Sequence, residues 1–256
     1  MNKEAFNNLF KNETDFDTLK LYDMYERAKS RGISLFTEDF YPPAIWKILD
    51  KISNKNFSVE SNGIFEDCDR RVIAFNKSEW SDYPIKLVEI KCNTKFSKLE
   101  HKDYLGSIMA LGIKREKIGD VILKGDNICY LATYEKIAFF IIDNLHKVKK
   151  LNCECRILDN FNEEIPKIEF KEEVINVASK RLDGIVAELA NISRSKACDL
   201  ISKGLVLVDY VQVTDKSYEV EEDMRITIRK IGKFKVKETL GTTKSGRLKI
   251  TVLKYA

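Results

Sequence analysis

The sequence predicts an α+β protein built from three successive parts. Residues 1–75 carry apolar side chains mostly at helical spacing, residues 76–160 alternate strand and helix patterns, and residues 173–256 combine two short amphipathic helices with a basic, strand-rich end. A polar run that contains Pro166 lies between the last two parts, so residues 161–172 are expected to be a linker. With 256 residues, of which 44% are hydrophobic, the chain is long enough to build more than one core.

The N-terminal part is expected to be helical, with a short hairpin at its end. Residues 4–31 and 37–52 show helical spacing, and the adjacent prolines of the second segment are tolerated only near its start. Residues 57–61 and 71–75 have the composition of strands and flank a polar turn. The aromatic side chains of this part are most simply interpreted as core.

The middle part shows a β-α-β-β-α-β order. A strand at 85–91 precedes a helix at 101–112, then two strands, a helix that Thr133 is expected to cap, and a closing strand. This order is typical of ferredoxin-like and RRM-like folds, so an antiparallel sheet backed by two helices is expected. RNA-recognition motifs carry several aromatic residues for base stacking on their third strand, whereas Tyr130 stands alone here. The sequence therefore gives little support for base stacking on this sheet.

Two short helices between residues 179 and 204 dominate the third part. Ser179 is expected to cap the first helix and Ser193 the second. Basic residues lie on the exposed face of the second helix, beside the backbone amides of its first turn, which are suited to binding a phosphate. Basic residues on a solvated helix face are common. However, ten basic residues against the single acid Glu238 follow from Arg225 to the end, and this local excess predicts contact with nucleic acid.

Cysteine and histidine usage argues against a metal site. The six cysteines include no C-x-x-C pair, and His101 and His146 are the two histidines, so neither zinc nor another cofactor is expected. Cys153 and Cys155 are expected on one face of a strand, as reduced thiols. The start of the chain has no apolar leader, and no run approaches the roughly 18 apolar residues of a membrane span, so a soluble cytoplasmic protein without membrane contact is expected.

Several motifs of the third part resemble a known RNA-binding domain. The segments K-R-L-D-G-I-V-A-E-L, I-S-R-S-K-A-C-D-L-I-S-K-G-L-V-L-V and V-x-x-D-M-R-I-T-I-R are similar to the alpha-L domain first defined in ribosomal protein S-four. The usual Val-Asn-Gly turn of that domain is replaced by Val208-Asp209-Tyr210. The resemblance implies binding to a structured RNA.

The middle part adds a second resemblance. Residues 101–120 contain H-x-D-x-L-G followed by L-G-I-x-R-E-x-I-G-D, and the C-terminal I-G-K-F-K-V and T-K-S-G-R-x-K-I-T-V-L-K-Y agree with it. Together these motifs resemble the YlmH family of ribosome-associated proteins, over about residues 70–256. The N-terminal helices resemble that family only loosely.

The resemblance implies a non-enzymatic protein that binds the large ribosomal subunit through ribosomal RNA and tRNA. It also implies participation in ribosome-associated quality control of stalled peptidyl-tRNA complexes. Separately, the protein is expected to be a monomer off the ribosome. The expected RNA-binding residues are Arg181, Arg194, Ser195, Lys196, Lys203, Lys233, Lys235, Lys244 and Arg247 in the third part, and His101, Lys102, Lys114, Arg115 and Lys117 in the middle part.

Other functions stay open as alternatives. Lys95-Phe96-Ser97-Lys98 resembles the K-M-S-K motif of class I aminoacyl-tRNA synthetases, but the partner H-I-G-H motif is absent from the sequence. Arg181-Leu182-Asp183 is similar to the R-L-D of pseudouridine synthases, yet it lies inside the alpha-L helix. The 11 glycines form no G-x-G-x-G run for a methyl donor. An RNA-modifying enzyme targeted by the alpha-L domain, or a cell-division-linked interaction protein, remains an alternative.

Overall fold

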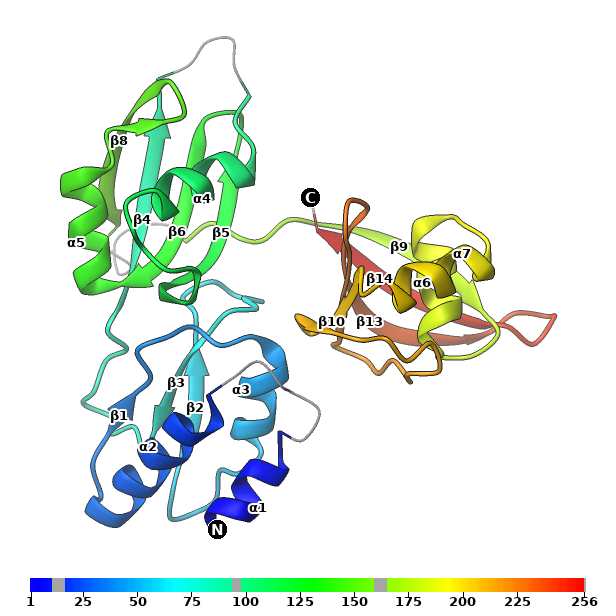
Figure 1. Ribbon diagram of the computed structural model, residues 1–256, viewed down its shortest axis with the longest axis horizontal. Helices are drawn as coiled ribbons and strands as arrows, with labels where there is room; N and C mark the ends of the chain where they lie inside the picture. The colour runs from blue at the N-terminus through cyan, green and yellow to red at the C-terminus, as the bar shows by residue number, and fades with distance from the viewer. Residues whose placement is uncertain (11–16, 94–97, 159–164, 256) are drawn as a thin grey trace. The chain divides into compact units, whose positions relative to one another are not determined.

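The computed structural model describes residues 1–10, 17–93, 98–158 and 165–255. The chain divides into two compact units, Met1–Ile168 and Glu169–Ala256 (Figure 1). Helices and antiparallel sheets occur in both units, so the predicted α+β class is confirmed. None of the helices in the described ranges has the length and apolar character required to cross a membrane. Residues 95–97 of the Lys-Phe-Ser-Lys motif and residues 161–164 of the expected linker lie outside the described residues.

The first unit begins with three helices and a small antiparallel sheet of order β1-β3-β2. The elements are α1 (Lys3–Asn8), α2 (Thr18–Arg31), β1 (Leu35–Phe36), α3 (Pro43–Asp50), β2 (Val59–Asn62) and β3 (Val72–Phe75). The helical character expected for residues 4–31 is confirmed in the described part of this stretch, where α1 and α2 lie. The second ends at Gly32, which adopts the left-handed conformation that glycine favours. The expected pairing of the two strand segments is confirmed, because Val59 lies opposite Phe75.

The helix expected over residues 37–52 starts later than predicted. Thr37 pairs with strand β3 instead of joining the helix. Its amide donates to the Ile73 carbonyl at 2.8 Å, and the Ile73 amide donates to Thr37 Oγ1 at 3.0 Å. The helix begins at Pro43, where a missing N–H costs nothing because the first helical amides have no intrahelical acceptor.

The middle of the first unit is a five-stranded sheet of order β5-β6-β4-β8-β7 in which all neighbours are antiparallel. Its elements are β4 (Ile85–Cys92), α4 (His101–Met109), the 3-10 turn η1 (Arg115–Lys117), β5 (Ile118–Lys124), β6 (Ile128–Tyr134), α5 (Glu135–Asn144), β7 (Lys147–Val148) and β8 (Leu151–Leu158). Helices α4 and α5 cover one face of this sheet (Figure 1). Tyr104 and Ile108 of α4 and Ile141 of α5 are buried there against Val88 and Ile90.

Thr133 does not cap helix α5, contrary to the sequence prediction. It is the sixth residue of strand β6, fully buried, and its hydroxyl donates to the Lys117 carbonyl at 2.9 Å. Tyr134 occupies the N-cap position instead, without a side-chain hydrogen bond. Pairing with the neighbouring strand therefore overrides the local capping preference of threonine.

Part of the opposite face of the middle sheet, including Tyr130, is covered by the N-terminal part. Phe40, Phe65 and Val72 pack against Leu87 and Tyr130 in one apolar cluster, and Tyr130 is only 8% exposed. Tyr130 is therefore not available to stack on a base, and the sheet cannot bind RNA in the manner of an RNA-recognition motif.

Polar contacts join the same two parts. The Asp120 carboxylate accepts hydrogen bonds from the Asp69 amide at 2.5 Å and the Arg70 amide at 3.1 Å. Lys117 Nζ lies 2.7 Å from Asp39 and donates to the Glu38 carbonyl at 2.9 Å. The N-terminal helices and the middle sheet consequently form a single unit.

The second unit is a six-stranded antiparallel sheet of order β11-β10-β12-β13-β14-β9, with two helices on one face. Its elements are β9 (Phe170–Val177), α6 (Leu182–Ala190), α7 (Arg194–Ser202), β10 (Val206–Val208), β11 (Val211–Gln212), β12 (Arg225–Ile228), β13 (Gly232–Thr242) and β14 (Leu248–Tyr255). The predicted apolar faces are confirmed, because Leu182, Ile185, Ala197 and Ile201 are all buried against the sheet with Phe234.

Asp209 and Tyr210 make the tight turn between β10 and β11. Their φ angles of 46° and 74° are those of a type I′ hairpin, the geometry that Asn-Gly would favour. Asp209 also accepts a hydrogen bond from the Arg225 amide at 2.8 Å, which ties the turn to strand β12. The replacement of the usual Asn-Gly thus preserves the turn.

Gly63 lies where the loop before β3 is packed too closely for a side chain. A Cβ at Gly63 would lie 2.3 Å from the Arg70 carbonyl oxygen, a backbone atom that cannot rotate away. We expect Gly63→Ala to lower the free energy of unfolding of the first unit by about 1–3 kcal/mol. The matched control is Gly106→Ala in α4, where nothing lies within 4 Å and added helix propensity should stabilise by about 0.5–1 kcal/mol. Equal effects of the two substitutions in urea titrations would contradict this account of the loop.

Candidate nucleic-acid interface

The first helix of the second unit begins two residues later than predicted. Ser179 is not its cap: Arg181 holds the N-cap position and α6 starts at Leu182. The chain before α6 pairs with another segment instead, because the Lys180 carbonyl accepts from the Val220 amide at 2.9 Å and Arg181 lies opposite Glu219. The predicted cap of α7 is confirmed, since Ser193 Oγ accepts from the Lys196 amide at 3.3 Å.

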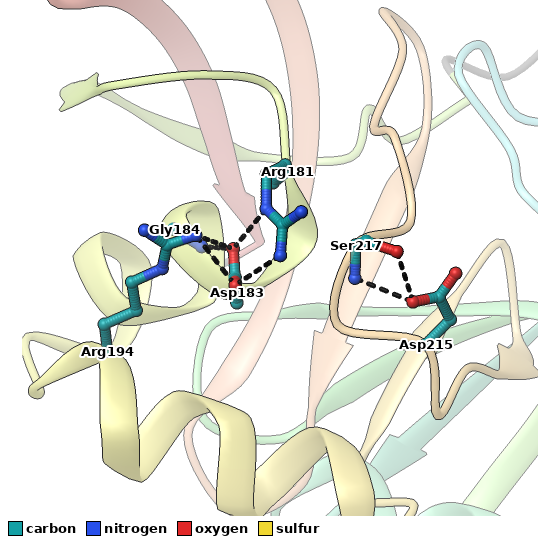
Figure 2. Close-up of polar contacts among 6 residues, drawn as sticks. All are labelled: Arg181, Asp183, Gly184, Arg194, Asp215 and Ser217. Carbon is teal, nitrogen blue, oxygen red and sulfur yellow. Dashed lines mark hydrogen bonds and ion pairs between the residues drawn. The ribbon is translucent and has the colours of Figure 1, made fainter.

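A buried carboxylate, Asp183, joins the starts of the two helices (Figure 2). Its side chain is 3% exposed, and it lies 3.0 Å from Arg181 Nη2 and 2.9 Å from Arg194 Nη2. Oδ1 also accepts from the Gly184 amide at 2.8 Å. One acid thus fixes two arginines that come from different helices.

The electrostatics of this cluster leave an excess of positive charge. Burial opposes ionisation of Asp183, but the hydrogen bonds from Arg181 and Arg194 outweigh burial, and the pKa of the carboxyl is lowered. Two guanidinium groups then share one negative charge. Their side chains remain 42% and 58% exposed, so each can present further N–H donors to a ligand. The cluster is suited to a phosphate, which matches the fork of arginine donors.

The same geometry explains the Arg181-Leu182-Asp183 triplet. Both carboxylate oxygens of Asp183 are engaged by arginines beneath the surface, which gives the aspartate a structural role rather than the exposed position of a nucleophile.

Other predicted RNA-binding residues of the second unit lie on α7 and on the β13–β14 hairpin. Ser195, Lys196 and Lys203 are exposed on or at the end of α7. Arg247 Nη2 donates to Glu188 Oε1 of α6 at 2.8 Å, so this end of the hairpin adjoins the helices. We call Arg181, Arg194, Lys196, Lys203 and Arg247 the helix-side surface.

Lys233 and Lys235 do not belong to the helix-side surface. They alternate along β13 with Phe234 and Val236, which are buried under the helices, so both lysines face the opposite side of the sheet. Lys233 Nζ is 2.5 Å from Tyr210 Oη and 4.0 Å from the centre of the Tyr255 ring. Lys235 is 12% exposed and lies 3.4 Å from Asp223. Lys244 is exposed beyond the end of β13.

Lys216 is a residue near the helix-side surface that sequence reasoning missed. Its carbonyl accepts from the Asp183 amide at 3.2 Å, and its side chain is exposed. It belongs to the loop that also contains Asp215, whose carboxylate accepts from Ser217 (Figure 2). No periodic pattern predicts such a loop, and the charge of the adjacent Asp215 cancels that of Lys216 in a local charge count.

The middle-domain candidates do not form a single surface. His101 and Lys102 open α4, with Lys102 Nζ 2.6 Å from Glu100, whereas the other three follow the end of that helix. Arg115 Nη1 donates to the Ile118 carbonyl at 2.6 Å, and Lys117 is held by Asp39. These two side chains therefore stabilise the unit internally, while the side chain of Lys114 is exposed.

Comparison with known proteins supports the resemblance drawn from the sequence. Residues 78–160 match the family described as "Putative RNA-binding domain in YlmH", and residues 180–226 match the S4 domain, which is the alpha-L type. A curated relative, "Ribosome-associated protein quality control protein P2" of Bacillus subtilis (strain 168), is 28% identical over 218 residues, covering 83% of this chain and 84% of the relative. A solved structure, "Cell division protein ylmH from Streptococcus pneumoniae", has 17% identity and a TM-score of 0.48, covering 64% of this chain and 96% of that one. The family matches and the curated relative confirm the predicted pair of RNA-binding domains.

We predict that Asp183→Asn destabilises the second unit by about 2 kcal/mol, less than the roughly 3–5 kcal/mol of fully buried pairs because both arginines are half-exposed. The folded pKa of Asp183 lies below its unfolded value, so the ion pair stabilises above the ordinary pKa of 3.8 and is lost as the pH falls through the folded pKa. The difference between wild type and variant in urea unfolding should therefore be full at neutral pH and shrink below about pH 4. The control Asp199→Asn, an exposed acid of α7, should change stability by less than about 0.5 kcal/mol at any pH. A difference that does not depend on pH would rule out the ion pair as its origin.

Proposed function

We propose, from the premise that this chain combines a YlmH-type RNA-binding domain with an S4 domain, that it is a non-enzymatic RNA-binding protein of ribosome-associated quality control. The observation that carries the proposal is the Arg181–Asp183–Arg194 cluster, in which a buried acid holds two half-exposed arginines at the surface. The name of the Bacillus subtilis relative supports the link to ribosomes and quality control.

The proposed partner is the large ribosomal subunit, contacted through ribosomal RNA and tRNA, in complexes that carry a stalled peptidyl-tRNA. The helix-side surface would bind the phosphates of a folded RNA. Fixed arginine forks read the spacing of phosphates rather than the identity of bases, so shape would supply most of the specificity. Such a role places the protein in the cytoplasm, as a monomer when it is off the ribosome.

The arrangement of the first unit supports a ferredoxin-like middle domain as part of this proposal. Strands β5, β6, β4 and β8 are adjacent in that order, each antiparallel to its neighbour, and the two helices lie on one face. We place this domain at residues 76–160, the N-terminal part at residues 1–75 and the S4 domain at residues 173–256.

The test removes charge from the helix-side surface without touching the ion pair. Lys196→Ala/Lys203→Ala should weaken binding to purified large subunits and reduce the slope of log affinity against log salt by about 0.7–0.9 for each lost contact. Arg194 is left intact because it also holds Asp183. Sedimentation through gradients at several salt concentrations provides the measurement.

The matched control is Lys171→Ala/Lys237→Ala, which removes the same charge from strands β9 and β13 at side chains that are 75% and 45% exposed. This variant should sediment with large subunits as the wild type does. If the wild type itself stays at the top of the gradient at low salt, the proposed function is wrong. If both double variants lose binding equally, only net charge matters and the helix-side surface has no special role.

A further inference from the structure

The surface through which the first unit would meet RNA is not the face of its sheet. The half of that face nearest the N-terminal part is buried by Phe40, Phe65 and their neighbours. Beyond them Arg156 Nε lies 2.7 Å from Glu89, and Lys91 lies opposite Glu154 in the register of β4 and β8. These two cations lie beside two acids, and among the described residues only Lys124 at the end of β5 adds a further cation on this side, so this face has little attraction for a polyanion.

The outer side of helix α5 is unsuitable for a different reason. Its exposed large side chains are Phe139 and Phe140, at 54% and 40% exposure, and Glu135 and Asp143 are exposed on the same helix. The same helix exposes a single lysine, Lys136, and Glu135 lies 3.5 Å from Lys86, so this largely apolar surface carries no excess of positive charge to bind phosphate.

The third surface is the edge formed by the β7–β8 turn and the start of α4. The run His146-Lys147-Val148-Lys149-Lys150 places four basic side chains in five residues, and all four are exposed. The sequence pattern does not predict this site, because the run lies between a helix and a strand and has no periodicity.

The turn itself breaks a local preference. Val148 lies opposite Leu151, so Lys149 and Lys150 are the two central residues of the hairpin, where Asn-Gly is favoured. Lys149 has a φ of 54°, a left-handed conformation that a lysine adopts at some cost. Two adjacent lysines at this position also repel each other. The local turn preference therefore does not explain the two lysines, and the contacts of each have to be considered separately.

One of the two lysines anchors the turn on helix α4. Lys149 Nζ lies 2.8 Å from Asp103 Oδ1, whose side chain is 4% exposed, and the Lys149 amide donates to Ser107 Oγ at 3.3 Å. The hydrogen bond from Lys149, together with the Glu100 amide, lowers the pKa of the Asp103 carboxyl. The anchor fixes the hairpin beside the start of α4 and neutralises the nearest acid.

The basic side chains at this edge come from two elements. Lys147 lies in strand β7 and Lys150 in the turn that follows it, whereas His101 and Lys102 lie in the first turn of α4. At the start of α4 a capping box is formed, in which the Glu100 side chain accepts from the Asp103 amide and the Asp103 side chain accepts from the Glu100 amide.

We propose that this edge, made of His101, Lys102, His146, Lys147 and Lys150, is a second RNA-binding surface that contacts phosphates. It deepens the proposed function and rests on it. Since the anchor at Lys149 holds the hairpin before any ligand arrives, little ordering cost opposes binding. The RNA contacted is recognised by its backbone, because the basic side chains of this edge outnumber its exposed acid, Glu100, which lies 2.6 Å from Lys102.

The experiment uses the full chain with Lys147→Glu/Lys150→Glu and leaves the Lys149 anchor intact. Two probes are titrated separately, protein-free ribosomal RNA of the large subunit and unfractionated tRNA. We expect affinity for at least one probe to fall about tenfold or more at 0.1 M salt, with a lower salt slope. The neutral variant Lys147→Gln/Lys150→Gln should show a smaller fall in the same direction. The control Lys124→Glu/Lys136→Glu reverses two exposed lysines elsewhere in the same unit and should change binding less than either.

Three outcomes would overturn the inference, and they are distinguishable. If wild type binds the probes and all variants bind equally well, the edge has no role while the proposed function stands. If the glutamate variant binds both naked RNAs normally but fails to bind intact large subunits, the edge meets a protein instead. If wild type binds neither probe nor intact subunits, the proposed function and this inference fail together. Unchanged melting temperatures exclude misfolding as the cause of any loss.

Discussion

Burial of one face of the middle sheet, and of the part of the other face that carries Tyr130, determines where the first unit can meet a partner. One face lies under α4 and α5, and part of the other is packed against Phe40, Phe65 and Val72 of the N-terminal part. Each large apolar side chain buried in this way contributes roughly 1.5–3 kcal/mol. Stacking of one base on an aromatic side chain contributes about 1–3 kcal/mol. Uncovering several apolar residues so that Tyr130 could stack on one base is therefore unfavourable, and contact with RNA is left to the edges of the sheet.

Both proposed basic surfaces are built on a buried acid. Asp183 holds Arg181 and Arg194 in the second unit, and Asp103 holds Lys149 in the first. The chemistry of the cation decides what each pair can do. A guanidinium carries five N–H donors in a fixed fork, so an arginine bound to the acid keeps donors for a phosphate. An ammonium is a compact charge, so Lys149 serves as an anchor and leaves its neighbours to bind. In each case folding itself orders the basic surface.

The sequence predicted well wherever a regular pattern determines structure, and poorly wherever a long-range pairing overrides one. The buried positions of α6 and α7 follow from helical spacing, and Ser193 caps α7 as its position suggests. Ser179 and Thr133 carry the same capping preference, yet neither caps a helix: the carbonyl of Lys180, the residue after Ser179, accepts from the Val220 amide, and Thr133 lies in strand β6 and donates to the Lys117 carbonyl. No local rule shows which distant segment will compete for a residue. The sequence shows that Lys233 and Lys235 alternate with apolar neighbours, but it does not show which face of the sheet the helices cover.

Tethering two separate basic surfaces in one chain also explains how weak contacts could yield selective binding. A lysine-rich edge alone attracts any polyanion, and its affinity falls steeply with salt. When the S4 unit is already bound to one RNA element, the linked first unit experiences a high effective concentration of neighbouring RNA, but only where the chain between them can span the distance. Selectivity then arises from the spacing of two phosphate-rich elements rather than from base contacts. A folded assembly with several RNA elements in fixed positions provides such a spacing, whereas an isolated helix does not.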